Sequence, residues 1–234
     1  MNILCTHPYE EEIEVSLTLS PFITDWSVAQ SKFIAGIVDK FDNWLRIRPS
    51  DFRMTKSDSL GEVQCSCQLF AGACRIVLSP DFLRLSFARI TRKDIPTVDE
   101  VLRRSMEWCS TDFSNHEQVL LSHTSNRHVE VVSGHSADYY LSQFTHKKVV
   151  DVMNSEQETK YQPSFHLTLS DKNNTWTLRR LLEVSQAIED GLFINTQIHL
   201  FSAQNMNFSG QKQLLEKLYR LADQSTGIEY RDNQ

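Results

Sequence analysis

The 234-residue sequence predicts an α+β protein, built mainly of antiparallel sheet with amphipathic helices packed on it. Short segments that alternate apolar and polar residues recur along the chain, as in strands with one buried face. Between them lie longer segments with apolar residues at helical spacing. Hydrophobic residues make up 40% of the chain and aromatic residues 10%, which is enough to fill a core.

The first half of the chain predicts strands and two helices. Residues 14–19 alternate as in a strand, and a helix follows from Trp26 to Phe41, with Thr24, Asp25 or Ser27 as its cap. Residues 44–48 alternate again. Three more strands are expected at 63–70, 74–78 and 82–90. A capping box then opens a second helix. Its apolar face is expected to consist of Val98, Val101, Leu102, Ser105, Met106 and Cys109.

The second half begins with a predicted hairpin. Residues 118–122 and 128–132 are its two strands, and Ser125 and Asn126 form its turn. The later elements expected are a short helix after Ser136, a strand at 165–169, a helix at 176–188, a strand at 193–201 and a last helix from Ser209.

A comparison of the chain with itself suggests an internal repeat. A shift of 150 residues aligns residues 17–20 with 167–170, both Leu-Thr-Leu-Ser, and Trp26 with Trp176. The predicted order strand, helix, strand is the same in both places, so we expect two similarly built β-α-β halves, a pseudo-duplication. These are an N-terminal β-α-β-rich half at 1–153, a candidate linker or loop at 154–163, and a C-terminal β-α-β-α half at 164–234, with one compact domain as the alternative. Such halves resemble helix-grip and hot-dog folds.

The N-terminal residues, the lengths of the apolar stretches and the cysteines indicate the cellular compartment that we expect. The first residues lack a basic and an apolar region and run into Glu10-Glu11-Glu12, so we expect no secretory signal. No apolar stretch approaches the roughly 20 residues that span a bilayer. The five cysteines are odd in number and lie mostly within apolar patterns, which favours reduced, packed thiols. A cytoplasmic protein without a membrane partner is therefore expected.

Charge is unevenly distributed, although the net charge is −6. Residues 45–104 hold 11 basic and 7 acidic residues, a balance of +4. On the expected strand 44–48, Trp44, Arg46 and Arg48 share one face. An aromatic side chain beside arginines is what phosphate contact and base stacking require, so these three are candidate polyanion-binding residues. The acidic total makes nucleic acid the less favoured partner.

His166 and Thr168 are the clearest candidates for catalysis. Residues i and i+2 of a strand share a face, so an imidazole and a hydroxyl would point the same way. The pair resembles one half of the His-x-Thr signature of the 2H phosphoesterases, a resemblance that implies a phosphoesterase or nucleotide-processing activity. That family carries two such motifs. The second candidate here, His199-Leu200-Phe201, has Phe in place of the hydroxyl residue.

His123 and His128 are the candidate metal ligands. In the expected hairpin they lie opposite each other, at about 5 Å between Cβ atoms. A stable site needs three or four ligands, and no Cys-x-x-Cys or His-Glu-x-x-His motif accompanies them. Exposed histidines without a metal are the favoured interpretation, and no cofactor is expected.

The sequence contains no Walker loop, no dinucleotide-binding glycine motif and no nucleophile elbow. It therefore favours a non-enzymatic binding or protein-interaction protein whose partner is protein, either another copy of the chain in a homo-oligomer or a different chain. A phosphoesterase and a polyanion binder are the alternatives.

Overall fold

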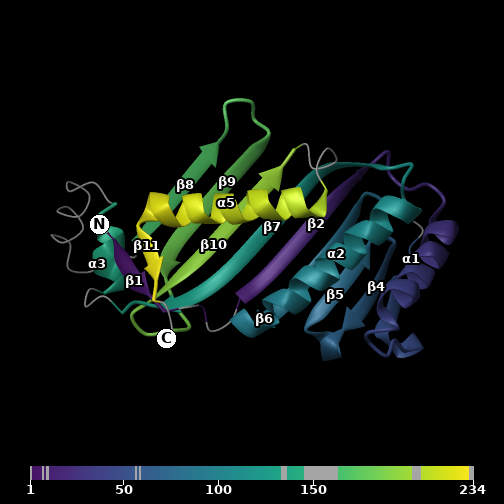
Figure 1. Ribbon diagram of the computed structural model, residues 1–234, viewed down its shortest axis with the longest axis horizontal. Helices are drawn as coiled ribbons and strands as arrows, with labels where there is room; N and C mark the ends of the chain where they lie inside the picture. Colours follow the sequence, from purple (N-terminus) through teal and green to yellow (C-terminus); the bar gives the residue numbers. More distant parts are fainter. Residues whose placement is uncertain are drawn as a thin grey trace. The chain divides into compact units, whose positions relative to one another are not determined.

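The computed structural model describes residues 2–6, 8, 11–55, 57, 59–132, 136–144, 163–201 and 207–231. Its main feature is a nine-stranded sheet with the strand order β3-β4-β5-β6-β2-β7-β10-β9-β8 (Figure 1). These strands are β2 (Glu11–Ser20), β3 (Phe52–Thr55), β4 (Gln64–Leu69), β5 (Cys74–Leu78), β6 (Phe82–Ile90), β7 (Glu117–Glu130), β8 (Ser164–Ser170), β9 (Trp176–Val184) and β10 (Gly191–Leu200). The α+β class with a large antiparallel sheet is confirmed.

The described ranges also contain four α-helices, four short 3-10 helices and two short strands. The α-helices are α1 (Trp26–Phe41), α2 (Ile95–Asp112), α3 (Ala137–Ser142) and α5 (Phe208–Thr226). A separate parallel pair consists of β1 (Ile3–Cys5) and β11 (Ile228–Tyr230). Within the described ranges, no helix is long and apolar enough to cross a membrane.

The chain divides into two compact units, and neither is continuous in sequence. Unit 1 comprises Met1–Glu11, Thr124–Ile198 and Leu214–Gln234, and unit 2 comprises Glu12–His123 and His199–Gln213. The strands β7 and β10 and the helix α5 each run from one unit into the other. Residues 154–162 of the candidate linker lie outside the described residues. The division into halves at 1–153 and 164–234 stays a prediction.

In unit 2, α1 and α2 lie on one face of β4, β5 and β6 (Figure 1). Asp25 caps α1 by accepting a hydrogen bond from the Val28 amide. Every residue of the predicted apolar face of α2 is buried, and Trp108 is buried with them. The indole of Trp108 meets the Phe33 ring edge-on, with 5.7 Å between ring centroids, so the two helices share one aromatic core.

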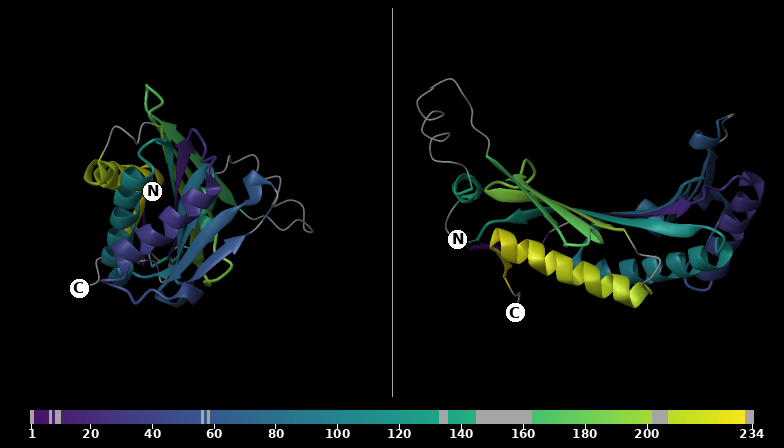
Figure 2. Two further views of the ribbon diagram at one scale, coloured as in Figure 1. Left: turned by 90° about the vertical axis from the view of Figure 1, so that its right-hand side faces the viewer. Right: turned by 90° about the horizontal axis from the view of Figure 1, so that it is seen from above.

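In unit 1, α5 lies along one face of β9 and β10 (Figures 1 and 2). Leu218 and Ala222 on α5 are buried, as the helical spacing predicts. A core cluster of this unit joins residues of both sheets and of α3. Its fully buried members include Ile3, Tyr140, Leu182 and Ile194.

The predicted helix at 176–188 is wrong, because residues 176–184 form strand β9. Leu178, Arg180 and Leu182 alternate toward the core, so a buried arginine occupies a position where the pattern suggested a polar surface residue. The corresponding segment in the repeat comparison is helix α1. Where the comparison requires two helices, the structure has one helix and one strand, so the C-terminal half does not have the expected β-α-β-α order. The pseudo-duplication is not confirmed.

The predicted hairpin at 118–132 is also wrong, because β7 runs without a turn from Glu117 to Glu130. Ser125 is fully buried and donates a hydrogen bond to the Glu11 carboxylate. The Asn126 side chain accepts a hydrogen bond from Asn195 Nδ2 at 2.6 Å. These contacts with distant residues keep both in an extended strand, and they outweigh the turn preference of a Ser-Asn pair.

The predicted strand at 44–48 is wrong: Trp44 lies in a turn that continues from the end of α1, Leu45 lies in a bend, and residues 46–48 are irregular. The amides of Trp44 and Leu45 both donate to the Phe41 carbonyl, and the Ile47 amide donates to Asp42 Oδ1 at 3.2 Å. The carboxylate of Asp42 therefore closes the turn that the alternation did not reveal.

Gly36 in α1 allows the close approach of α2. A Cβ atom at this position would lie 1.9 Å from Trp108 Nε1, inside the indole ring. At an exposed position inside a helix, replacing Gly by Ala stabilises the helix by roughly 1 kcal/mol. Here the side chain would have to displace a buried indole. We expect Gly36→Ala to lower the free energy of unfolding by about 1–3 kcal/mol, measured by urea denaturation.

Gly61→Ala is the matched control, because the nearest heavy atom to its new Cβ is 4.0 Å away. Its effect should stay within about 0.5 kcal/mol. A Gly36→Ala variant as stable as the unmodified protein would contradict the proposed contact.

Candidate functional site

The face of the unit 1 sheet opposite α5, here called the open face, carries the main candidate site. Along β9, Arg179, Leu181 and Glu183 point to this face, because their neighbours Arg180 and Leu182 point to the core. No helix from the described part of unit 1 covers the open face (Figure 2). On this face of β9, Arg179 is exposed, and Leu181 and Glu183 are half-buried.

His166 and Thr168 lie on the open face of β8, and both are exposed. The strand prediction is thus confirmed, and so is the shared face of the two side chains. In the antiparallel register of β8 and β9, Thr168 is opposite Arg179 and His166 is opposite Leu181. An arginine, a hydroxyl and an imidazole thus share one exposed surface, a combination that can contact a phosphate.

A cavity of about 400 Å³ lies at the other end of the same strands. It is lined by His128, Pro163, Ser164, Glu183, Val184, Gln186 and Phe193. Ser164 is opposite Glu183 in the register, and the His128 ring lies 5.0 Å from the Phe193 ring. Strands β7, β8, β9 and β10 each contribute to the walls. No short sequence motif could have revealed this site, because its residues come from four separate strands.

Hydrogen bonding favours one tautomer of His128. Ser185 Oγ accepts the amides of Ala187 and Ile188 at 3.1 and 3.0 Å. Both acceptor positions of the hydroxyl are then used, so it donates its own proton to His128 Nδ1, 2.9 Å away. This arrangement leaves the proton of a neutral imidazole on Nε2.

The other candidate histidines lie apart from this site. His199 is on β10, and its Nδ1 is 2.9 Å from Ser122 Oγ. Strand β9 lies between β8 and β10 in the sheet, so His199 and His166 are not on adjacent strands. His123 is buried and His128 is half-buried. Five residues apart on one strand, they face opposite sides of it and cannot share a metal ion. No group of three or more metal-ligating residues occurs in the described part of the chain.

Trp44 is 37% exposed, and neighbouring side chains pack against its ring. The Arg104 guanidinium lies 5.0 Å from its ring centroid, and the Phe41 and Phe70 rings pack against it at 6.4 and 5.6 Å. Arg46 and Arg48 do line a common cavity of about 390 Å³. Polyanion binding at this cavity stays a prediction.

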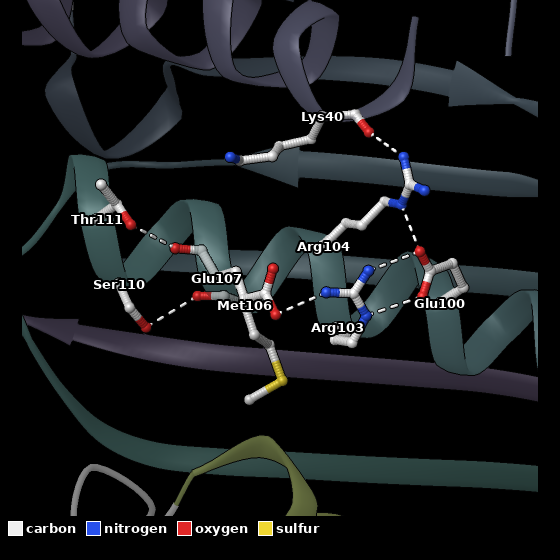
Figure 3. Close-up of polar contacts among 8 residues, drawn as sticks. All are labelled: Lys40, Glu100, Arg103, Arg104, Met106, Glu107, Ser110 and Thr111. Carbon is white, nitrogen blue, oxygen red and sulfur yellow. Dashed lines mark hydrogen bonds and ion pairs between the residues drawn. The ribbon is translucent and has the colours of Figure 1, made fainter. Parts of the chain in front are cut away.

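Unit 2 has a larger cavity of about 960 Å³ beside α2, and its walls include Arg103, Glu107 and Ser110. Arg103 is held by two hydrogen bonds to Glu100 and one to Glu107, all of 2.7–2.8 Å (Figure 3). Hydrogen bonds from Arg103 and Arg104 lower the pKa of Glu100 to about 2. These side chains neutralise one another along the helix, so they offer no unbalanced charge to a ligand.

Buried charges occupy the opposite face of the unit 1 sheet, under α5. Arg127 Nε lies 2.9 Å from Glu11 Oε1, and its guanidinium lies 4.9 Å from the Tyr219 ring on α5. Arg180 Nη2 lies 2.7 Å from Asp223 Oδ1, also on α5. Burial works to lower the pKa of Arg127, but Glu11, Tyr230 and Tyr219 together outweigh it, so the pKa lies above its usual range.

The Arg180–Asp223 pair is an ion pair without a well-aligned hydrogen bond. The arginine side chain is fully buried, and none of its three guanidinium nitrogens has a hydrogen-bond partner in the described chain. A buried charge held in this way is expensive to desolvate. The sequence did not reveal either pair, because each joins residues far apart in the chain.

All five cysteines are buried and free. Burial raises the pKa of each thiol, to about 12 for Cys5 and about 11 for Cys65. At neutral pH they are therefore protonated and poor nucleophiles.

Comparisons with known proteins add no functional information. No family model matches the chain, and no curated protein matches it.

Replacing Arg180 tests whether its charge is compensated mainly by Asp223. Arg180→Met leaves a carboxylate without its cation and should cost about 3 kcal/mol of unfolding free energy in urea denaturation. The double variant Arg180→Met/Asp223→Asn removes both charges and should recover most of the loss. Strictly additive effects of the two substitutions would show that the residues do not interact.

Proposed function

We propose that the protein is a non-enzymatic binding protein that pairs with a second copy of its own chain through the edge of β8. The observation that carries this proposal is the chemistry of that edge. β8 is the last strand in the sheet order, and no described strand pairs with its outer side. An open edge presents unpaired N–H and C=O groups to another strand.

The β8 edge lacks the usual protection against pairing. Proteins protect edge strands with charged side chains, proline, bulges or short length. β8 has the sequence Ser-Phe-His-Leu-Thr-Leu-Ser, seven residues without a formal charge, proline or glycine. At the other end of the strand order, β3 has four residues, including the exposed Arg53. Of these two edges, β8 is the one suited to strand addition.

A second copy fits this edge by symmetry. An antiparallel pair centred on Leu167 sets Phe165 opposite Leu169 of the second copy on the core side. On the open face it sets His166 opposite Thr168 of the second copy. Apolar residues meet apolar residues and polar residues meet polar ones, without opposed charges. The same patch serves both copies, as a two-fold dimer requires.

Thr168→Lys tests the edge directly. It places a charge next to the centre of the proposed pairing, opposite His166 of the second copy, where the two lysines would be diagonal neighbours on one face. We expect the unmodified protein to show a monomer–dimer equilibrium in sedimentation velocity over micromolar to millimolar concentrations, and Thr168→Lys to be monomeric.

Thr177→Lys is the matched control, since Thr177 lies on β9 and is flanked by strands on both sides. This variant should dimerise like the unmodified chain. A protein that is monomeric throughout the concentration range would exclude self-pairing and point to a different extended chain as the partner.

The phosphoesterase alternative is favoured by one observation, the position of Arg179 opposite Thr168. Arginine would hold a phosphate while His166 transfers a proton. The proposed dimer would also bring together two His-x-Thr segments, which is the number found in the 2H phosphoesterases that this segment resembles. His166, rather than His199, would then be essential.

His166→Ala should abolish hydrolysis of bis-p-nitrophenyl phosphate if this alternative holds, whereas His199→Ala should retain it. Absorbance of released nitrophenolate measures the rate, and circular dichroism checks that both variants fold. Hydrolysis by the unmodified protein no faster than in buffer would exclude the alternative with this probe.

A further inference from the structure

The cavity lined by Glu183, Phe193 and His128 carries an inference that does not depend on pairing at β8. We propose that it binds a small organic cation, an alkylammonium or guanidinium group, with the charge beside the Glu183 carboxylate. Its volume of about 400 Å³ lies in the range of small-molecule sites in proteins.

Charge selects the class of ligand. Among the lining residues that the structure describes, Glu183 is the only one with a carboxylate and none is a lysine or an arginine, while Nδ1 of His128 is engaged with the Ser185 hydroxyl. Glu183 is half-buried, and within the described ranges no lysine, arginine or histidine forms an ion pair with it. A partly desolvated carboxylate that has no counter-ion among the described residues favours a cation from solution.

The other walls suit the carbon chain of such a cation. Phe193 and Val184 offer apolar surface, and the negative face of an aromatic ring attracts a cation. Ser164, opposite Glu183 in the strand register, can accept a hydrogen bond from the ammonium group. Ser185 holds the His128 ring against Phe193, so this wall is fixed before the ligand arrives.

The test uses n-butylammonium chloride as the probe, followed in two-dimensional ¹H–¹⁵N NMR spectra of the full chain. We expect shift changes at Glu183, Phe193 and His128 that saturate in the millimolar range, as suits a ligand of five heavy atoms. The neutral analogue 1-butanol should bind at least about 10-fold more weakly, because it lacks the charge that pairs with the carboxylate. The same titration with N-acetyl-lysine-methylamide shows whether the cavity accepts the lysine side chain of a peptide or only a free amine.

Glu183→Gln keeps the shape and removes the charge, so it should weaken n-butylammonium binding by at least about 10-fold. Glu189→Gln is the matched control, an equal change of charge at an exposed residue that does not line the cavity. Equal affinity for butanol and butylammonium, unchanged affinity in Glu183→Gln, or no shift changes at the cavity would each overturn the proposal. Sedimentation of Glu183→Gln separates this result from dimerisation, which the substitution should not change.

Discussion

The buried charges that hold α5 on unit 1 are the constraint on which the rest of this unit depends. Arg127 and Arg180 point from β7 and β9 toward the core, where their charges are balanced by Glu11 and Asp223. Asp223 lies on α5, so the helix must remain over these strands for the Arg180 charge to be compensated. Removing either partner would leave a buried charge, and so the pair fixes which face of the sheet is covered.

Because α5 covers one face of the unit 1 sheet, the open face is the one on which a ligand can bind. In strands, each residue that points to α5 has neighbours that point to the open face. Arg180 and Leu182 face the core, so Arg179 and Glu183 face outward, beside Thr168 and Ser164 of β8. The polar groups of the open face are therefore placed by the same alternation that builds the core. The same alternation places Glu183 in the wall of its cavity.

The sequence predicted well where one local pattern decides the structure. The spacing of apolar residues in α2 identified its buried face, and the alternation around His166 identified β8. It failed where a distant partner decides the structure. The pattern of β9 predicts a helix only if Arg180 is exposed, whereas this arginine is buried in a strand. Where a hairpin is expected, contacts of Ser125 with Glu11 and of Asn126 with Asn195 keep β7 extended.

The candidate site could be predicted only in part for the same reason. His166 and Thr168 are two residues apart, so a strand pattern was enough to place them together. Glu183, Phe193 and His128 meet only because three strands lie side by side in one order. That order depends on packing between strands far apart in the chain, which a single sequence does not encode in any short segment.

Hydrogen–deuterium exchange of β8 as a function of protein concentration is the most direct test of pairing through this edge. In an antiparallel strand, alternate amides point away from β9. If two copies pair there, these amides of residues 164–170 should exchange slowly at high concentration and rapidly on dilution, while the amides bonded to β9 stay unchanged. Outward-pointing amides that exchange equally fast at every concentration would contradict the account.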